Sequence, residues 1–176
     1  MVLNDTKGIV KVDNGAGLYA TNDSRIENKG TISLTGSGTG IAARGISETK
    51  GTPTFTYGNT GKIEIVNSGK INIVGKNSIG IYAENNKGIA SSNVTVNNSG
   101  KIITSKKLAH AVVLKQTNPR AASTPDKADM NFNHYGIIDV SSPSGNDAGN
   151  IGVFSDGEAL ANFYNGAKVY VGDDSI

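Results

Sequence analysis

A corner motif that recurs along the chain constrains its fold more than any other feature. Six segments align on one slot, which in chain order holds Thr6, Asn28, Asn67, Asn98, His134 and Asn165. Aliphatic residues alternate on both sides of the slot, which is typical of two short strands joined by a bend. A third strand is predicted at GLYA (17), GIAA (40), GIYA (80), AVVL (111) and GVFS (152). The sequence therefore predicts three strands in each repeat.

These repeats cannot bury their inward-facing side chains alone. A single turn of three strands leaves its Ile and Val residues in water, and only the turns above and below can cover them. Strands joined by crossovers in one sheet are almost always connected with the right hand. We therefore expect an all-β, right-handed parallel β-helix of about six coils, with residues 1–176 forming a single segment.

The slot residues are interpreted as structural. Asn tolerates the left-handed backbone region, and stacked Asn side chains can hydrogen-bond from coil to coil. We expect such a ladder to contain Asn28, Asn67, Asn98, His134 and Asn165, with the following Gly meeting the same backbone need. Ligand binding is the alternative role, but recurrence at one structural place favours the ladder.

Insertions interrupt the repeat at 43–60, 84–93, 115–129 and 141–149, and they contain all four prolines of the chain. The first three follow the third strand, so we expect them to leave one corner of the rod as a cluster of loops. This cluster is the predicted binding surface for a glycan or protein. Its candidate binding residues are Arg44, Lys50, Tyr57, Lys115 and Arg120. Solvated loops, or an extra irregular coil within 43–60, are the alternatives.

A row of large side chains is predicted on the outer face of the third strands. Tyr19, Tyr82 and Phe154 share one outward position, and Val113 shares it too. We expect these aromatic rings to stack on one another between coils. Contact with a partner, or cover by a loop, are the other two interpretations of the row.

Catalytic and cofactor chemistry find little support in the sequence. The outward position five residues after each slot contains one carboxylate, Asp139, and Asp173 and Asp174 adjoin each other near the C-terminus. General acid–base catalysis needs positioned partners, so we expect no enzyme activity and no catalytic residues. His110 and His134 sit at different repeat positions, and there are no cysteines, so neither a metal nor another cofactor is expected.

Charge and hydropathy exclude two further partners. The net charge of +2 comes from interspersed basic and acidic residues, so no block attracts nucleic acid. No apolar run is long enough to span a bilayer as a helix, so this segment is not expected to insert into a membrane. Uncapped end coils could allow end-to-end self-association.

The run NSGKINIVGKNSIGIYAENN, with weaker copies along nearly the whole chain, resembles the passenger repeats of type V autotransporters. The resemblance is greatest to fusobacterial outer-membrane adhesins. It implies a β-helix displayed on the bacterial surface above a C-terminal translocating barrel, where it mediates attachment to host or bacterial cells. The chain lacks the signal and barrel of the full pattern, so we expect one piece of a passenger. A purely structural stalk and a polysaccharide-degrading β-helix enzyme are the alternatives.

Overall fold

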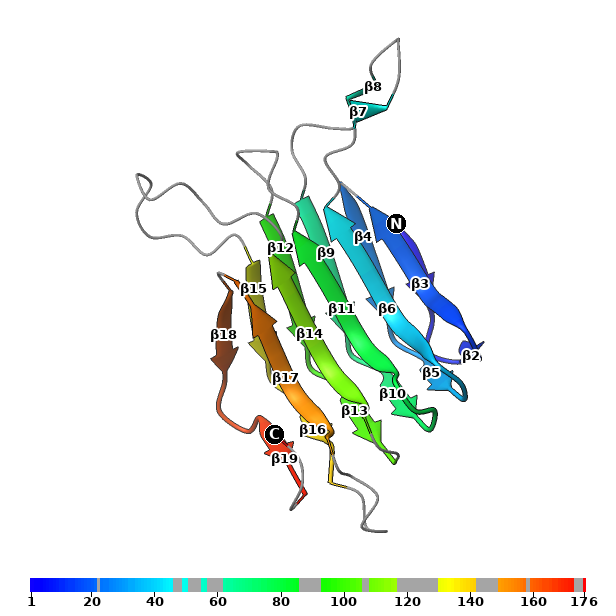
Figure 1. The fold of residues 1–176 in the computed structure, drawn as a ribbon, viewed down its shortest axis with the longest axis vertical. Helices are drawn as coiled ribbons and strands as arrows, with labels where there is room; N and C mark the ends of the chain where they lie inside the picture. The colour runs from blue at the N-terminus through cyan, green and yellow to red at the C-terminus, as the bar shows by residue number, and fades with distance from the viewer. Residues whose placement is uncertain are drawn as a thin grey trace.

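The computed structural model describes residues 1–21, 23–45, 49–50, 55–56, 62–85, 93–105, 108–116, 130–141, 149–157, 159–172 and 176. Every regular element within these ranges is a β-strand. Three sheets, here named A, B and C, contain only parallel neighbours; each of the first five coils contributes one strand to each sheet in turn, and the sixth contributes β-strands to sheets A and B within the described residues. The strands stack along one axis, with the N- and C-termini at opposite ends of the stack (Figure 1). The chain is a parallel β-helix of about six coils, as the repeat predicts.

The three sheets run along the whole stack. Sheet A contains β1 (Val2–Asn4), β4 (Ser24–Asn28), β9 (Lys62–Asn67), β12 (Asn93–Asn98), β15 (Met130–His134) and β18 (Leu160–Phe163). Sheet B contains β2 (Ile9–Val12), β5 (Thr31–Leu34), β10 (Lys70–Ile73), β13 (Lys101–Thr104), β16 (Ile137–Asp139) and β19 (Lys168–Tyr170). Sheet C contains β3 (Gly15–Thr21), β6 (Gly38–Gly45), β11 (Ile79–Asn85), β14 (His110–Gln116) and β17 (Ile151–Asp156).

The core is a set of columns in which like residues lie on like. In sheet B, Ile32, Ile71, Ile102 and Ile138 face one another in successive coils, and none of them is exposed to solvent. The period of two along each strand turns these residues inward. Burying one such side chain is worth about 1.5–3 kcal/mol relative to leaving it in water. Stacking of coils therefore supplies the burial that a single coil lacks.

The slot is occupied as predicted in the four central coils but not in the first and last. Asn4, not Thr6, lies beside Asn28, and Phe163, not Asn165, lies beside His134. The corner between sheets A and B is two residues longer in both end coils than in their neighbours. Counting back from the aliphatic residues of sheet B therefore gives the wrong slot residue there.

The bend glycines are needed for a reason other than the one expected. None of the slot asparagines has a positive φ among the described residues, and among the described bend glycines between sheets A and B only Gly166 of the last coil has one, at 90°. A Cβ on Gly69 would instead lie 2.1 Å from the Gly30 carbonyl oxygen, and one on Gly100 would lie 2.1 Å from that of Gly69. In the four central coils the left-handed backbone interpretation is therefore wrong, whereas Gly166 in the last coil fits it. In the central coils glycine is required because the corner of the preceding coil leaves no space for a side chain.

The first three insertions are shorter than the sequence predicts, because strands of sheet C occupy their first residues. β6, β11 and β14 extend into the expected insertions, and each precedes a strand of sheet A, so the three segments that follow them connect the same two sheets. Within the first of them, β7 (Thr49–Lys50) and β8 (Phe55–Thr56) form an antiparallel pair, drawn beyond the ends of sheet C in Figure 1. Of the other insertion residues, the structure describes Asn93 at the start of β12, Ser141 and Gly149, and the rest lie outside the described part of the chain.

Candidate functional site on the outer face of sheet C

The slot residues form a hydrogen-bonded column inside the rod, here called the interior ladder. The side-chain nitrogen of Asn4 donates to the Asn28 oxygen, Asn28 donates to Asn67, and Asn67 donates to Asn98, each over 2.7 Å. Asn28, Asn67 and Asn98 are fully buried. The predicted hydrogen-bonded ladder of Asn28, Asn67 and Asn98 is thus present, and each of these amides is engaged by its neighbours in the column.

His134 continues the ladder and ends it. Asn98 Nδ2 lies 3.1 Å from His134 Nδ1, and His134 Nε2 lies 3.2 Å from the Lys168 carbonyl oxygen. An amide nitrogen can only donate and a carbonyl oxygen can only accept, so Nδ1 is the acceptor and Nε2 carries the hydrogen. The next coil places Phe163 in the slot, with its ring 5.8 Å from the His134 ring in an edge arrangement. His134 is therefore the last hydrogen-bonding residue of the interior ladder, and an aromatic ring follows it in the next coil.

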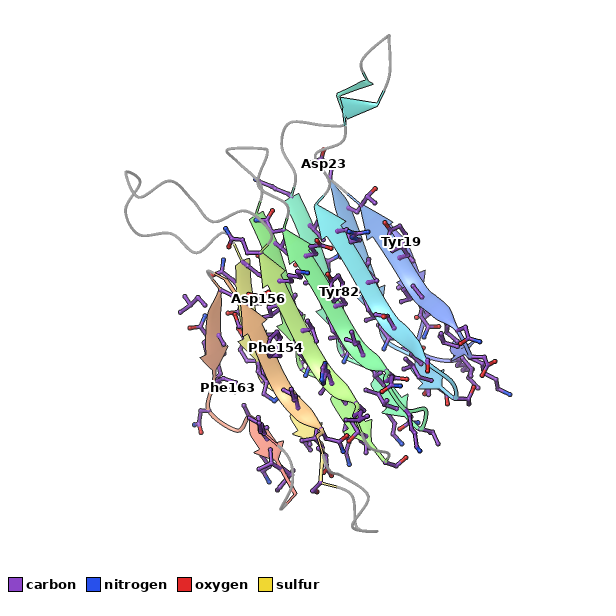
Figure 2. The ribbon with its side chains drawn as sticks, in the orientation of Figure 1. Tyr19, Asp23, Tyr82, Phe154, Asp156 and Phe163 are labelled. Carbon is purple, nitrogen blue, oxygen red and sulfur yellow. The ribbon has the colours of Figure 1, made fainter. Side chains whose placement is uncertain are left out.

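A row of outward-facing side chains crosses sheet C and is here called the aromatic row. It contains Tyr19, Ala42, Tyr82, Val113 and Phe154, which are register partners in successive coils. Figure 2 shows Tyr19, Tyr82 and Phe154 in a line across the strands. Tyr19 is 47% exposed and Phe154 43%, whereas Ala42 and Val113 are each 7% exposed. Aromatic ridges thus alternate with aliphatic troughs along the coil axis.

The aromatic residues of this row do not stack on one another, contrary to expectation. They lie in every second coil, so successive members are about 9.6 Å apart along the axis, twice the strand spacing. Stacked rings need centroids within about 4.5–7 Å. Phe154 contacts the His110 ring instead, with centroids 6.4 Å apart and planes inclined by 22°. Tyr19, Tyr82 and Phe154 are therefore separated from one another along the axis, each by one coil with a smaller side chain.

A second row runs beside the first and is here called the charged row. It contains Thr21, Arg44, Glu84, Lys115 and Asp156, also in register, so that the charges alternate in sign from the second coil to the fifth. Both rows lie on the outer face because their residues alternate with the buried ones in each strand. The two rows together form the candidate site.

One carboxylate joins the two rows. Arg44 Nε donates to Glu84 Oε2 over 2.7 Å, and the Tyr82 hydroxyl donates to the same oxygen over 2.9 Å. The Glu84 side chain is only 7% exposed, whereas that of Arg44 is 48% exposed. Glu84 therefore holds the Tyr82 ring and the Arg44 side chain in fixed positions on the face.

The protonation states of these groups follow from their contacts. Burial alone would raise the pKa of Glu84, but hydrogen bonds from Arg44 and Tyr82, with the charges of Arg44 and Lys115, hold it below its ordinary value. Burial, together with the hydrogen bond to Glu84, raises the pKa of Tyr82 to about 12. At neutral pH, Glu84 is therefore charged and Tyr82 keeps its hydroxyl hydrogen.

Two of the five predicted binding residues lie in this site. Arg44 is in β6 and Lys115 in β14, one on either side of Glu84 in the charged row, so both are strand residues and not loop residues. Lys50 is in β7, and Tyr57 and Arg120 lie outside the described residues. The structure thus brings together Arg44 and Lys115 but does not place the other three beside them.

Sequence reasoning missed Glu84 and Asp156 as members of the site. Each follows an aromatic residue of the row by two positions, as Arg44 follows Ala42 and Lys115 follows Val113. In a strand, residues two apart share a face. That offset is the signal by which the charged row could have been found.

The outer face of sheet A carries a second asparagine column that the sequence analysis also missed. The side-chain nitrogen of Asn162 donates to Asn133, and that of Asn133 donates to Asn97, each over 3.0 Å. These donors point toward the N-terminal end of the stack, opposite to the interior ladder. The column braces the surface of the same strands whose inner face carries the ladder.

A polar hollow of about 530 Å³ lies at the start of the strands of sheet A, lined by Asp23, Ser24, Arg25, Lys62, Ile63, Glu64 and Thr95. Arg25 forms ion pairs there with Glu64 and, at 3.8 Å, with Glu27. The central charges of the hollow are thus engaged with one another. We consider it a weaker candidate than the face of sheet C.

The other residues weighed for chemistry show no catalytic arrangement. Asp139 accepts hydrogen bonds from the Ser141 hydroxyl at 2.6 Å and the Ser141 backbone nitrogen at 3.2 Å, which caps the end of β16. Asp173 and Asp174 lie outside the described residues. Within the part of the chain that the structure describes, no cluster of three or more His, Cys, Asp or Glu residues could hold a metal ion.

In the described ranges, the structure has no helix that is long and apolar enough to cross a membrane. By its fold, the chain is a parallel β-helix. No family model, curated protein or solved structure matches it.

Proposed function

We propose that this chain is a passenger segment of a bacterial surface adhesin and attaches to host or bacterial cells through the outer face of sheet C. The observation that carries the proposal is the aromatic row, in which Tyr19 and Phe154 remain about half exposed beside Arg44, Lys115 and Asp156. The resemblance to autotransporter passenger repeats supplies the cell-surface setting.

Physical considerations support binding at this face. Aromatic side chains bury a large area with few rotatable bonds, and they are enriched among the residues that dominate binding energy. Charged groups beside them add selectivity and orientation. The rows also stand on a hydrogen-bonded sheet, so little order has to be created when a partner binds.

A purely structural stalk is the second candidate. The interior ladder and the bend glycines stabilise stacking in every central coil, and a stalk would need them whether or not any face binds a partner. The enzyme alternative has less support, because the outer column of sheet B pairs Asp139 with Ile103 and Tyr170. Carboxylate catalysis would need a second acid in reach.

Single-site labelling can test the adhesin proposal, because the chain has no cysteine. Tyr19→Cys introduces a unique thiol on the outer face of sheet C, and Lys11→Cys introduces one on the outer face of sheet B in the same coil. Each variant is coupled to a maleimide–polyethylene glycol chain. Binding of the fluorescent protein to host and bacterial cells is then measured by flow cytometry.

The two labelled proteins should behave differently. We expect the Lys11→Cys conjugate to bind cells as the unmodified protein does, and the Tyr19→Cys conjugate to lose binding. Equal binding by the two conjugates would show that the face of sheet C is not used. Absence of binding by the unmodified protein to every cell type would favour the stalk.

A further inference from the structure

We infer that the aromatic row is a binding track for a neutral, unbranched β-1,4-linked polysaccharide, whose chain lies along the coil axis with every second sugar stacked on an aromatic ring. This inference rests on the proposed function and names the class of its ligand. The juxtaposition behind it is the placing of Tyr19, Tyr82 and Phe154 in alternate coils of one sheet face.

The period of the row matches the repeat of such a glycan. Two coils rise by about 9.6 Å, which is close to the length of two pyranose units in an extended β-1,4 chain. In that extended ribbon, successive sugars are turned over by half a rotation, so every second sugar presents the same face. An aromatic ring in every second coil can therefore meet the same sugar face three times.

The relief of the surface fits stacked sugars. The apolar C–H groups on one face of a pyranose ring pack against an aromatic ring, while the hydroxyl groups point outward to its sides. Ala42 and Val113 fill the coils between the ridges, with only 7% of each exposed, so the intervening sugar meets a low aliphatic surface. The chain can thus rest on the ridges without a clash between them.

The charged row supplies hydrogen-bonding groups along one edge of the track. Lys115 and Asp156 are adjacent in register, yet no ion pair joins them within the described residues. Arg44 uses Nε to hold Glu84, and no described residue accepts a hydrogen bond from its two terminal nitrogens. Donors and an acceptor are thus available to sugar hydroxyls.

The same row argues for a neutral glycan over a charged one. Arg44 and Lys115 are balanced by Glu84 and Asp156, so the alternation leaves no net field along the face to attract a polyanion. A uronic acid polymer would meet two carboxylates on its path. Hydroxyl groups can bond with both signs of charge.

The test uses soluble oligosaccharides of defined length. Cellobiose, cellotriose, cellopentaose and cellohexaose, and the matching N-acetylchito-oligosaccharides, are titrated into the whole chain by isothermal calorimetry. Maltohexaose, whose α-1,4 links curve the chain, is the control ligand. In at least one β-linked series, affinity should rise when three sugars reach two ridges and again when five reach three. A sixth sugar should add little.

Variants locate the binding on the row. Tyr82→Ala removes the central ridge and should weaken pentasaccharide binding by about tenfold or more, the equivalent of one stacked contact. Tyr82→Phe keeps the ring and loses only the bond to Glu84, so it should bind nearly as the parent does. Retained binding in Tyr82→Phe beside weakened binding in Tyr82→Ala assigns the effect to the missing ring. Tyr170→Ala, which removes an exposed tyrosine from the outer face of sheet B, should have no effect.

The outcomes separate this inference from the function on which it rests. Cell attachment that depends on the Tyr19 face, without binding of any β-linked oligosaccharide, would overturn the glycan and leave the adhesin proposal standing. Equal affinity for maltohexaose and cellohexaose, or binding unchanged in Tyr82→Ala, would also overturn it. If the unmodified chain binds neither cells nor any of the oligosaccharides, the glycan inference and the adhesin proposal are both overturned.

Discussion

Replacement of a single asparagine inside the rod should cost far more stability than replacement of its neighbour on the surface. Asn97 and Asn98 are consecutive residues of β12, and they belong to different columns. Asn98 is fully buried in the interior ladder, whereas Asn97 is only partly buried in the outer column of sheet A. The pair therefore compares one chemical change in two environments.

The magnitude follows from the bonds that each change removes. In Asn98→Ala, the side-chain nitrogen of Asn67 loses its acceptor and Nδ1 of His134 loses its donor. Neither atom has another hydrogen bond to a described residue, and both residues are fully buried. A buried polar group without a partner costs about 1–3 kcal/mol, so the two together cost about 2–6 kcal/mol. This is a large part of the stability of a typical domain.

The surface change should cost much less. Asn97→Ala removes a 3.0 Å bond from Asn133 and a 3.4 Å contact with Glu64. Both partners are part-exposed, so water can take the place of the lost amide. Surface substitutions of this kind usually change the free energy of unfolding by about 0.5 kcal/mol or less. The difference between the two variants should thus exceed about 1.5 kcal/mol.

Urea unfolding followed by far-ultraviolet circular dichroism measures the free energy of both variants, since the chain has no tryptophan for fluorescence. The slope against urea must stay constant, because a solenoid can also unfold coil by coil. Asn97→Ala is the matched control. Equal destabilisation by the two substitutions, or a larger effect of Asn97→Ala, would refute the view that the interior ladder is a sealed and obligatory network.

Three further predictions concern the corner and the face of sheet C. Gly100→Ala should lower the urea midpoint strongly, because its Cβ would lie 2.1 Å from the Gly69 carbonyl oxygen; a midpoint within error of the parent would contradict the close-approach argument. Glu84 has a pKa below its ordinary value of 4.5, so the unfolded chain takes up that proton first as the pH falls. Its contribution to stability is present above pH 4.5 and is lost as the pH falls through the folded-state value. Glu84→Gln should flatten that part of the pH–stability curve, and an unchanged curve would count against it. Burial lowers the pKa of His110 below 6.5, so stability should fall as the pH drops below 6.5; His110→Gln should remove this fall, measured as Tm against pH, and persistence of the fall would exclude His110 as its source.

The sequence predicts the coil well because its signal lies within single repeats. Asn28, Asn67 and Asn98 are flanked by aliphatic residues at fixed offsets, and the same offsets place Ile71 and Ile102 in the core. Period-two burial is a local property, so it survives insertions of any length between repeats. The three-sheet architecture follows from it directly.

In the two end coils the pattern within a repeat predicts the wrong slot residue. Thr6 and Asn165 satisfy the spacing to sheet B, but lengthened corners move the true slot to Asn4 and Phe163. Two extra corner residues keep the pattern of inward and outward residues unchanged, so the alternation cannot reveal them. The outer column of Asn97, Asn133 and Asn162 was missed for the same reason, since Asn162 falls into line only when Phe163 occupies the slot.

Properties that arise between coils were the least predictable. The bend glycines of the central coils look like turn residues within one repeat, yet they are required because a carbonyl oxygen of the coil before lies where a Cβ would be. The aromatic row was expected to stack because its members share one position, but stacking depends on which coils they occupy. The candidate site itself depends on Glu84, which links Tyr82 to Arg44 across two coils.

The interior of this rod repeats with every coil, whereas the outer face of sheet C repeats with every second coil. Inside, Asn67 and Asn98 are equivalent, and each coil could be exchanged for the next, so removing either of these two coils would leave the hydrogen-bonded column intact. On sheet C, the pattern returns only after two coils, and the same deletion would bring two ridges, or two troughs, side by side. Chains of this kind can therefore change in length by single coils without losing their fold, but only by pairs of coils without losing their surface.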